Sequence, residues 1–216
     1  YHVLGTKVTS NMVTTGYVSS LGTNSTMDPL SIYVNTTSGV KLNDKAMVVI
    51  PDVMASNGVI HAIDQVILPL SIYQLLEMNG DYATLTAALG IADGGLDDLL
   101  SDVDAGPFTL FAPNEVAFGN LLTELNIADV PTLVTALGTD GLANVLTYHV
   151  VAGNINSNEV PAGPVSTVNG DNVSFDLTNG VIITDARMRT SEVIAVDIQG
   201  TNGVIHGISK VILPTP

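Results

Sequence analysis

The chain has 216 residues, of which 46% are hydrophobic and none is cysteine, and its formal net charge is −15 at pH 7. The lack of cysteine excludes disulfides and thiolate chemistry, and no apolar run reaches the roughly 18 residues that a membrane-spanning helix needs. No Lys or Arg stands between Ala46 and Ala186, and such an acidic surface disfavours binding to nucleic acids and to anionic membranes.

The first part of the chain carries strand patterns. Ile32 and Val34 alternate with polar neighbours, and Met47–Ile50 is a short apolar run. Asp28-Pro29 and Ser38-Gly39 are typical turn sequences. Because no helical period occurs here, we predict strands only.

Helical patterns occupy the middle of the chain. Asn79-Gly80 predicts the end of a first helix, and Asp81 is placed to cap the next one. A short helix is predicted at Leu96–Leu100 and a strand at Phe108–Phe111, with Asn114 as the following N-cap. Three amphipathic helices are then predicted from apolar residues at i, i+3, i+4 and i+7, namely Phe118, Leu121, Leu122 and Leu125, then Val130, Leu133, Val134 and Leu137, then Leu142, Val145, Leu146 and His149.

Strand patterns return in the last part of the chain. Val173–Leu177 alternates with period two, and Val181–Ile183 and Val193–Ile198 are apolar runs. Helices followed by strands predict an α+β fold, with an antiparallel sheet or a wedge of two sheets and the helices grouped at one side.

An internal repeat organises these elements. Asn57–Pro69 and Asn202–Pro214 are nearly identical, and Tyr1-His2-Val3 matches Tyr148-His149-Val150. The histidines of the two pairs are separated by 206 − 61 = 145 and 149 − 2 = 147 positions. A unit of this length has the size of a domain.

The repeat predicts two units of unequal completeness. We expect residues 1–69 to be the C-terminal half of a first domain and residues 70–216 to be a complete second domain. The strands of the first unit would expose an apolar face that its own missing helices should cover, and such faces rarely stay bare. We therefore expect either a separate fragment that completes residues 1–69 or a homo-oligomer.

Three segments carry a resemblance to a known family. Phe108–Phe118 resembles the first homology box of fasciclin domains, Tyr148-His149 resembles their tyrosine-histidine motif, and Asn202–Pro214 resembles their second box. The segments occur in the order and at the spacing of that family. The resemblance implies a fasciclin-like β-sandwich or wedge flanked by helices, an extracellular or cell-surface location, and a role in adhesion.

Two equivalent segments are candidates for partner binding. Pro51-Asp52-Val53-Met54 is similar to the Pro-Asp-Ile-Met segment that animal matrix members of the family use for integrin recognition. Its equivalent is Val196-Asp197-Ile198-Gln199, which lacks the Pro and the Met. Asp52, Val53, Asp197 and Ile198 are therefore candidate partner-binding residues. The alternative is that each aspartate accepts backbone N–H bonds at the turn before Asn-Gly.

The tyrosine-histidine pair gives two further candidates, Tyr148 and His149. The family associates adhesion with this region, and a tyrosine ring with a polar tip suits an interface. All four histidines lie in repeated motifs, so two histidines per unit could ligate zinc or copper. The alternative, which we favour, is that their ring nitrogens bond backbone groups and that the chain has no metal or cofactor.

The remaining motifs argue against catalysis. The chain has no Gly-X-Ser-X-Gly, His-Glu-X-X-His or Gly-X-X-X-X-Gly-Lys sequence. The acidic segment Asp93–Asp104 could hold calcium, but its spacing is not that of an EF-hand, and a solvated helix end is the better account.

We therefore predict a non-enzymatic adhesion module, secreted or at the cell surface. Its partner would be an extracellular matrix or cell-surface protein or a polysaccharide, bound weakly by each module and more tightly by repetition. One alternative is a carrier of a pigment or a lipid-like molecule in an apolar pocket between helices and sheet. Another is a structural spacer without a saturable partner.

Overall fold

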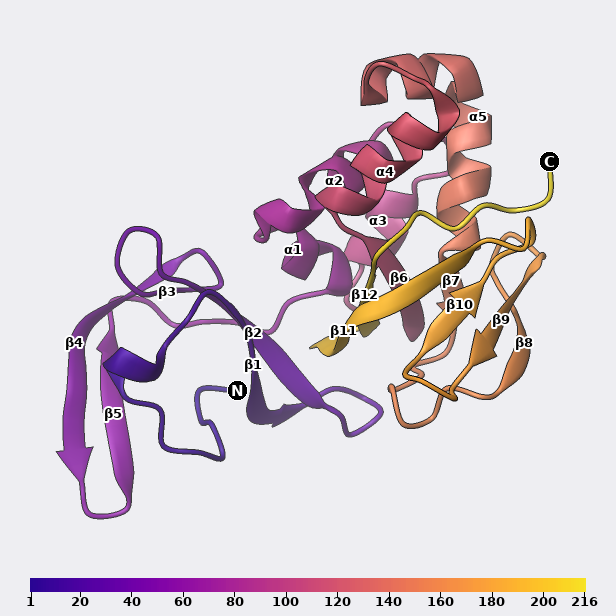
Figure 1. Ribbon diagram of the computed structural model, residues 1–216. Coiled ribbons are helices and arrows are strands. Elements are labelled where there is room, and N and C mark those ends of the chain that lie inside the picture. Colours follow the sequence, from indigo (N-terminus) through magenta and orange to yellow (C-terminus); the bar gives the residue numbers. More distant parts are fainter.

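Two β-sheets and one group of helices make up the computed structural model, which describes residues 1–216 (Figure 1). The small lobe, residues 1–69, contains a five-stranded antiparallel sheet in the order β1-β2-β3-β4-β5, so β5 is an edge strand. Its elements are the one-turn helix η1 (Ser10–Met12), β1 (Gly16–Thr23), β2 (Pro29–Asn35), β3 (Lys41–Leu42), β4 (Ala46–Ala55) and β5 (Gly58–Ile63).

The large lobe, residues 70–216, contains a seven-stranded sheet in the order β7-β6-β12-β11-β10-β9-β8. The pair β6–β12 is parallel and all other neighbours are antiparallel. The strands are β6 (Phe108–Pro113), β7 (Val150–Ala152), β8 (Gly163–Ser166), β9 (Asn172–Asp176), β10 (Ile182–Thr184), β11 (Thr190–Gly200) and β12 (Gly203–Ile208). Patterning predicted β6, β9, β10 and β11, the repeated second box contains β12, and β7 and β8 were missed.

The helices all belong to the large lobe apart from η1, and they gather beside β6 and β12 (Figure 1). They are α1 (Ile72–Glu77), η2 (Gly80–Tyr82), α2 (Ala83–Leu89), α3 (Leu96–Ser101), α4 (Glu115–Leu125) and α5 (Val130–Tyr148). The second and third predicted amphipathic helices are continuous in α5, except for a kink at Gly138, whose φ of 70° is not helical. No helix has both the length and the apolar character that crossing a membrane requires.

Capping residues explain where the helices begin. Ser71 and Gln74 form a reciprocal capping box at α1, and Asn114 accepts a hydrogen bond from the backbone N–H of Ala117 at α4, as predicted. The prediction that Asp81 caps α2 is wrong. The side chain of Asn79 caps the short η2 instead, and α2 follows without a side-chain cap.

The helices and the sheet share the main hydrophobic core. It contains leucines of every α-helix and reaches the sheet at Leu110, Ile198 and Ile205. A second core lies on the other face of the sheet, where Phe111 and Phe175 have ring centroids 5.4 Å apart. The predicted α+β class and the grouping of helices at one side are confirmed. The helices lie together because the apolar stripe of each one packs in the same core, on one face of the large sheet.

The two lobes touch through a polar interface at β2 and β11. The Asp28 carboxylate accepts hydrogen bonds from the side chains of Asn154 and Asn156, at 2.8 Å each. The hydroxyl of Ser31 accepts from the backbone N–H of Gln199 at 2.9 Å. These bonds fix the small lobe against the strands of the large lobe.

Gly203 shows why the Asn-Gly corner of the large lobe needs glycine. Its φ is 153°, and a Cβ at this position would lie 2.0 Å from the carbonyl oxygen of Phe108. Glycine tolerates this positive φ, and the close approach of β6 gives a second reason for a residue without Cβ. The neighbouring Val204, Ile205 and Ile208 of β12 are fully buried, so the second box supplies core contacts.

Candidate functional site

The two candidate aspartates occupy matching β-bulges. The pairing of β4 with β5 shifts between Ile50 and Val53, and the pairing of β11 with β12 shifts between Ala195 and Ile198. The aspartate in each bulge has a φ of 58°, a left-handed conformation that aspartate tolerates better than most residues. The carboxylate of Asp52 faces the loop before β1, and the carboxylate of Asp197 faces the loop before β8.

Each carboxylate is bound by a serine about forty residues earlier in the chain. Asp197 accepts hydrogen bonds from the backbone N–H of Ser157 at 2.7 Å and from its hydroxyl at 2.5 Å. Asp52 accepts the same two bonds from Ser10, the backbone one at 2.9 Å. These bonds hold the pKa of the Asp52 carboxyl below its ordinary value, because they stabilise the charged form.

A histidine closes the same cluster in each lobe. His206 donates from Nε2 to the carbonyl of Ile155 at 2.9 Å and accepts at Nδ1 from the backbone N–H of Asp197 at 3.3 Å. His61 makes the equivalent contacts with Val8 and Asp52, at 2.8 and 3.4 Å. The aspartate and the histidine together clamp the loop to the strand, so we call Asp52, Ser10 and His61, and Asp197, Ser157 and His206, the two loop clamps.

Sequence reasoning placed the aspartates at a turn but missed their serine partners. The expected bonds to the Asn-Gly turn are replaced by bonds to a distant loop. The serines could have been found from the repeat, since Ser10 and Ser157 are 157 − 10 = 147 positions apart, the same offset as the tyrosine-histidine pair.

Tyr148 and His149 are buried rather than exposed. The Tyr148 hydroxyl donates to the carbonyl of Asn172 and accepts from the backbone N–H of Ala186, both at 2.8 Å. Burial raises the pKa of this hydroxyl to about 12. The tyrosine therefore ties the end of α5 to the strands and has no atom at the surface for a partner.

His149 links α5 to the second homology box. Its Nδ1 donates to the carbonyl of Val145 at 2.8 Å, and its Nε2 accepts from the backbone N–H of Ile212 at 3.2 Å. Burial lowers the pKa of His149 to about 4. In the small lobe, His2 likewise accepts from the backbone N–H of Ile67 at 3.3 Å.

All four histidines thus bond to backbone groups, and the structure contains no group of three or more His, Asp or Glu side chains arranged to hold a metal ion. In the acidic segment, Asp93 accepts a hydrogen bond from the hydroxyl of Thr139 at 2.7 Å, and Asp102 accepts from the backbone N–H of Asp104 at 3.0 Å.

The exposed residues beside the bulges are apolar in both lobes. Ile194 and Val196 on β11 are about half exposed, and their equivalents Val49 and Pro51 on β4 are exposed as well. We call these two sets the strand patches. The candidates next to them differ, because Val53 is exposed and Ile198 is buried in the core.

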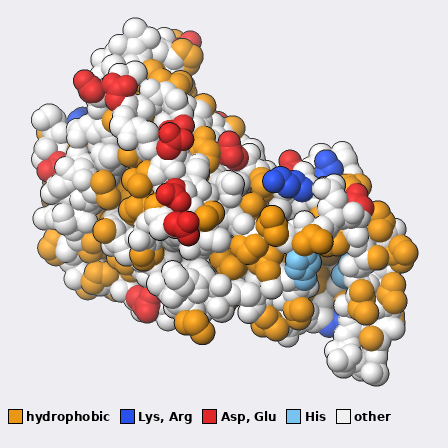
Figure 2. Space-filling view, turned by 180° about the vertical axis from the view of Figure 1, so that it is seen from behind, with side chains coloured by type: hydrophobic (Ala, Val, Ile, Leu, Met, Phe, Trp, Pro, Cys, Tyr) orange, Lys and Arg blue, Asp and Glu red, His pale blue; other side chains and the backbone are white.

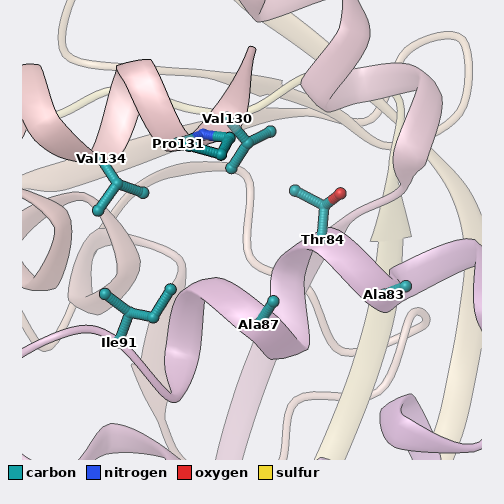
Figure 3. A pocket seen from close by; sticks show the side chains of 7 residues that line it. All are labelled: Ala83, Thr84, Ala87, Ile91, Val130, Pro131 and Val134. Atoms are coloured by element: carbon teal, nitrogen blue, oxygen red, sulfur yellow. The ribbon is translucent and has the colours of Figure 1, made fainter.

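A shallow apolar groove lies elsewhere, between α2 and the start of α5. Figure 3 shows its side chains facing one another across the gap. Its volume is about 520 Å³, and no charged residue lines it. The lining residues are Ala83, Thr84, Ala87, Ile91, Val130, Pro131 and Val134.

Comparisons with known proteins agree with this architecture. The model of the Fasciclin domain family matches residues 1–69 and 80–214. Protein sll1483 of Synechocystis sp. (strain ATCC 27184 / PCC 6803 / Kazusa) is 36% identical over 145 residues, which are 67% of this chain and 74% of that protein. The uncharacterized protein sll1735 of the same organism is 36% identical over 133 residues, which are 61% of this chain and 89% of that protein.

A solved structure shares the fold. It is a FAS1 domain pair from the insect cell adhesion molecule Fasciclin I, with a TM-score of 0.59 and 18% identity. The match covers 86% of this chain and 67% of that one. At this identity the likeness shows the fold alone. The family match over both lobes, together with the repeated boxes and their shared contacts, shows that the chain belongs to the fasciclin domain family.

Proposed function

We propose that the chain is a non-enzymatic adhesion module, secreted or displayed at a cell surface, that binds a matrix or cell-surface protein or a polysaccharide through its strand patches. The observation that carries the proposal is their repetition. The same chain presents exposed apolar residues beside a loop clamp twice, once on β4 and once on β11. Two weak sites on one chain bind a repetitive surface more tightly than either site does alone.

The family supports this proposal. It includes adhesion proteins and secreted proteins, and the solved relative comes from a cell adhesion molecule. The chain's acidity further favours a partner that is not a polyanion. Residues 1–69 and 70–216 serve in this proposal as the second half of one fasciclin domain and a complete second one.

The candidate residues have different roles in the proposal. The exposed side chain of Val53 and the partly exposed carboxylates of Asp52 and Asp197 stand next to the partner. Tyr148 and His149 act through positioning, since both are buried. Replacing that pair would disturb the fold, so a loss of adhesion on their replacement would not identify a contact.

The test uses exposed residues whose replacement leaves the core intact. We expect Val49→Ser combined with Val196→Ser to reduce adhesion to an array of matrix proteins and polysaccharides by about tenfold or more, and each single change to reduce it less. Val168→Ser is the matched control, because Val168 is an exposed valine away from both patches. Adhesion that survives the double change, or that falls equally with the control, would contradict the proposal.

The groove between α2 and α5 favours a second candidate function, the carriage of an apolar small molecule, although it lies between two helices and not between helices and sheet as the sequence-based alternative had it. Its volume of about 520 Å³ and its uncharged lining suit a ligand with a pigment-like or lipid-like character. Mass spectrometry of organic extracts of the purified protein tests this function, and Ala87→Gln would block the groove. A carrier loses its ligand with that change, whereas an adhesion module keeps its adhesion.

A further inference from the structure

The groove between α2 and α5 is apolar, although it lies in the most acidic part of the chain. Residues 70–147 contain eleven Asp and Glu and no Lys or Arg, so they carry −11 of the net charge of −15. None of these carboxylates stands in α2 or between Val130 and Thr139 of α5. Figure 2 shows acidic side chains gathered on the large lobe with hydrophobic ones between them. Because exposed helix faces usually carry charged or polar residues, this uncharged pair of faces points to contact with an apolar molecule.

The two helices have separate inward and outward faces. Leu85 and Leu89 of α2 and Leu133 of α5 are buried in the main core and hold the helices in place. On the outward side, Ala87 is exposed and Ile91 is 50% exposed, and both line the groove. The inward leucines thus supply the contacts to the core, and the outward side chains are free to contact a ligand.

Carboxylates stand at both ends of the groove, which Figure 3 shows extending from Thr84 to Ile91. At the first end, Glu115 accepts hydrogen bonds from the backbone N–H of Thr84 at 2.6 Å and from its hydroxyl at 2.8 Å. Just beyond Ile91, Asp93 accepts a hydrogen bond from the hydroxyl of Thr139 at 2.7 Å. Glu115 and Asp93 are exposed residues, so both charges are accessible to a ligand in the groove.

These surroundings select the charge of a ligand. An anionic head group, such as a carboxylate or a phosphate, would meet only negative charge, because the helical segment has no Lys or Arg to pair with it. A cationic head group is attracted to the carboxylates at the ends of the groove. The apolar remainder of the same molecule suits the uncharged lining and the volume of about 520 Å³.

We propose that the ligand of this groove is a cationic amphiphile, an apolar chain or ring system that ends in an amine or a quaternary ammonium group. Its apolar part lies along Ala87, Ile91 and Val134, and its cation lies beside the carboxylate at either end of the groove. The inference rests on the second candidate function, the carriage of an apolar small molecule, and names the class of ligand that is carried.

Three probes with one chain length and different head groups test the proposal on the unmodified protein. They are decylamine, decanol and decanoate, measured by isothermal titration calorimetry at pH 7 below the concentrations at which they form micelles. The amine is protonated at this pH, as a lysine side chain is. We expect decylamine to bind about tenfold more tightly than decanol, and decanoate to bind more weakly than decanol. Added salt should reduce the preference for the amine.

The outcomes separate this inference from the carrier function. Decanol that binds as tightly as decylamine overturns the inference and leaves the carrier function in place. If none of the three probes binds, both are overturned. Ala87→Gln places a longer side chain in the groove and should remove the binding of decylamine and decanol alike. Decylamine that still binds to this variant lies elsewhere on the acidic surface, which also overturns the inference.

A variant with two charges removed tests where the cation lies. Glu115→Gln combined with Asp93→Asn keeps an acceptor for each threonine bond and removes both negative charges. It should lower the ratio of the affinities for decylamine and decanol by about threefold or more. Binding of decanol should stay unchanged, because the apolar lining is intact.

The matched control removes the same amount of charge from exposed carboxylates on β9 and β11, in the variant Asp176→Asn combined with Glu192→Gln. Asp176 resembles Glu115 in accepting bonds from the backbone N–H and the hydroxyl of a threonine, Thr178, at 2.9 and 2.6 Å. The control should leave the ratio unchanged. A ratio that falls equally in both variants overturns the inference, because the amine then responds to the overall charge and not to the groove.

Discussion

Lowering the pH from 7 to 5 should destabilise the fold through His149. Burial lowers the pKa of this histidine from 6.5 to about 4, against the opposing influence of the Val145 carbonyl and the Asp185 carboxylate. Between these two values the unfolded chain binds a proton that the folded chain does not bind. The free energy of unfolding therefore decreases as the pH is lowered. The full shift is worth about 3 kcal/mol, and about 2 kcal/mol of it is lost by pH 5.

The geometry gives the loss a structural cause. Nε2 of His149 accepts the backbone N–H of Ile212, and a proton on Nε2 removes that acceptor. The pKa of His206 is also lowered by burial, so it contributes a further loss in the same direction. Carboxylates whose pKa is lowered, such as Asp129 and Asp171, lose their contribution only at lower pH, near and below the ordinary carboxyl range.

Urea unfolding followed by circular dichroism at pH 7, 6 and 5 measures the effect. His149→Gln retains a hydrogen-bond acceptor without titrating, so it should lose about 2 kcal/mol less between pH 7 and 5 than the unmodified chain. Equal losses in the two proteins would refute the assignment to His149, whatever the stability of the variant at pH 7.

Three further changes test the packing and the clamps. Gly203→Ala should lower the free energy of unfolding by about 3 kcal/mol or more, because its Cβ would overlap the Phe108 carbonyl. Gly58 occupies the equivalent position in the small lobe, where a Cβ would meet no atom within 4 Å, so Gly58→Ala should change the unfolding midpoint little. Similar effects at both sites would contradict the close approach at Gly203. Asp197→Ala should cost about 2 kcal/mol by removing both bonds from Ser157, and proteolysis within residues 153–158 should accelerate if the clamp holds that loop. Asn114→Ala should cost about 1 kcal/mol through the lost cap of α4, and Asn114→Ser should restore most of it.

Periodicity predicted the fold class because the apolar residues follow the geometry of each element. Leu121 and Leu142 sit on the predicted helical faces and are buried. The misses are local. Strand β8 has Gly163 and Pro164 in its first two positions, which weaken any strand pattern. The side chain of Asn79, rather than that of Asp81, caps the turn before α2, a choice that depends on the short helix η2.

The candidate site was less predictable because burial depends on contacts between distant segments. Tyr148 and His149 carry polar atoms and suit a binding surface as well as a core. Only the fold shows that Asn172, Ala186 and Ile212 satisfy those atoms. Likewise, the sequence shows that Asp52 and Asp197 are equivalent, but the partner of each carboxylate lies about forty residues away.

The two candidate segments are equivalent in sequence but not in availability. In the large lobe, the Gln199 side chain accepts a hydrogen bond from Asn24 at 3.2 Å and donates to Asn156 at 2.5 Å, and its backbone N–H binds Ser31. Gln199 therefore joins the large lobe to Asn24 and Ser31 of the small lobe. Its equivalent in the small lobe is Met54, which is 59% exposed.

This difference accounts for the glutamine that stands at position 199 in place of the methionine. A methionine at position 199 could not make the polar bonds between the lobes. Ile198 is buried in the core beneath the helices, so it is not available to a partner. Of the two segments, only Pro51-Asp52-Val53-Met54 keeps all its apolar side chains exposed. If a partner contacts the whole segment, Met54→Gln should weaken adhesion. Because Met54 is exposed, the variant should unfold at the same urea concentration as the unmodified chain. Adhesion that is unaffected by this change would restrict recognition to the residues that both strand patches share.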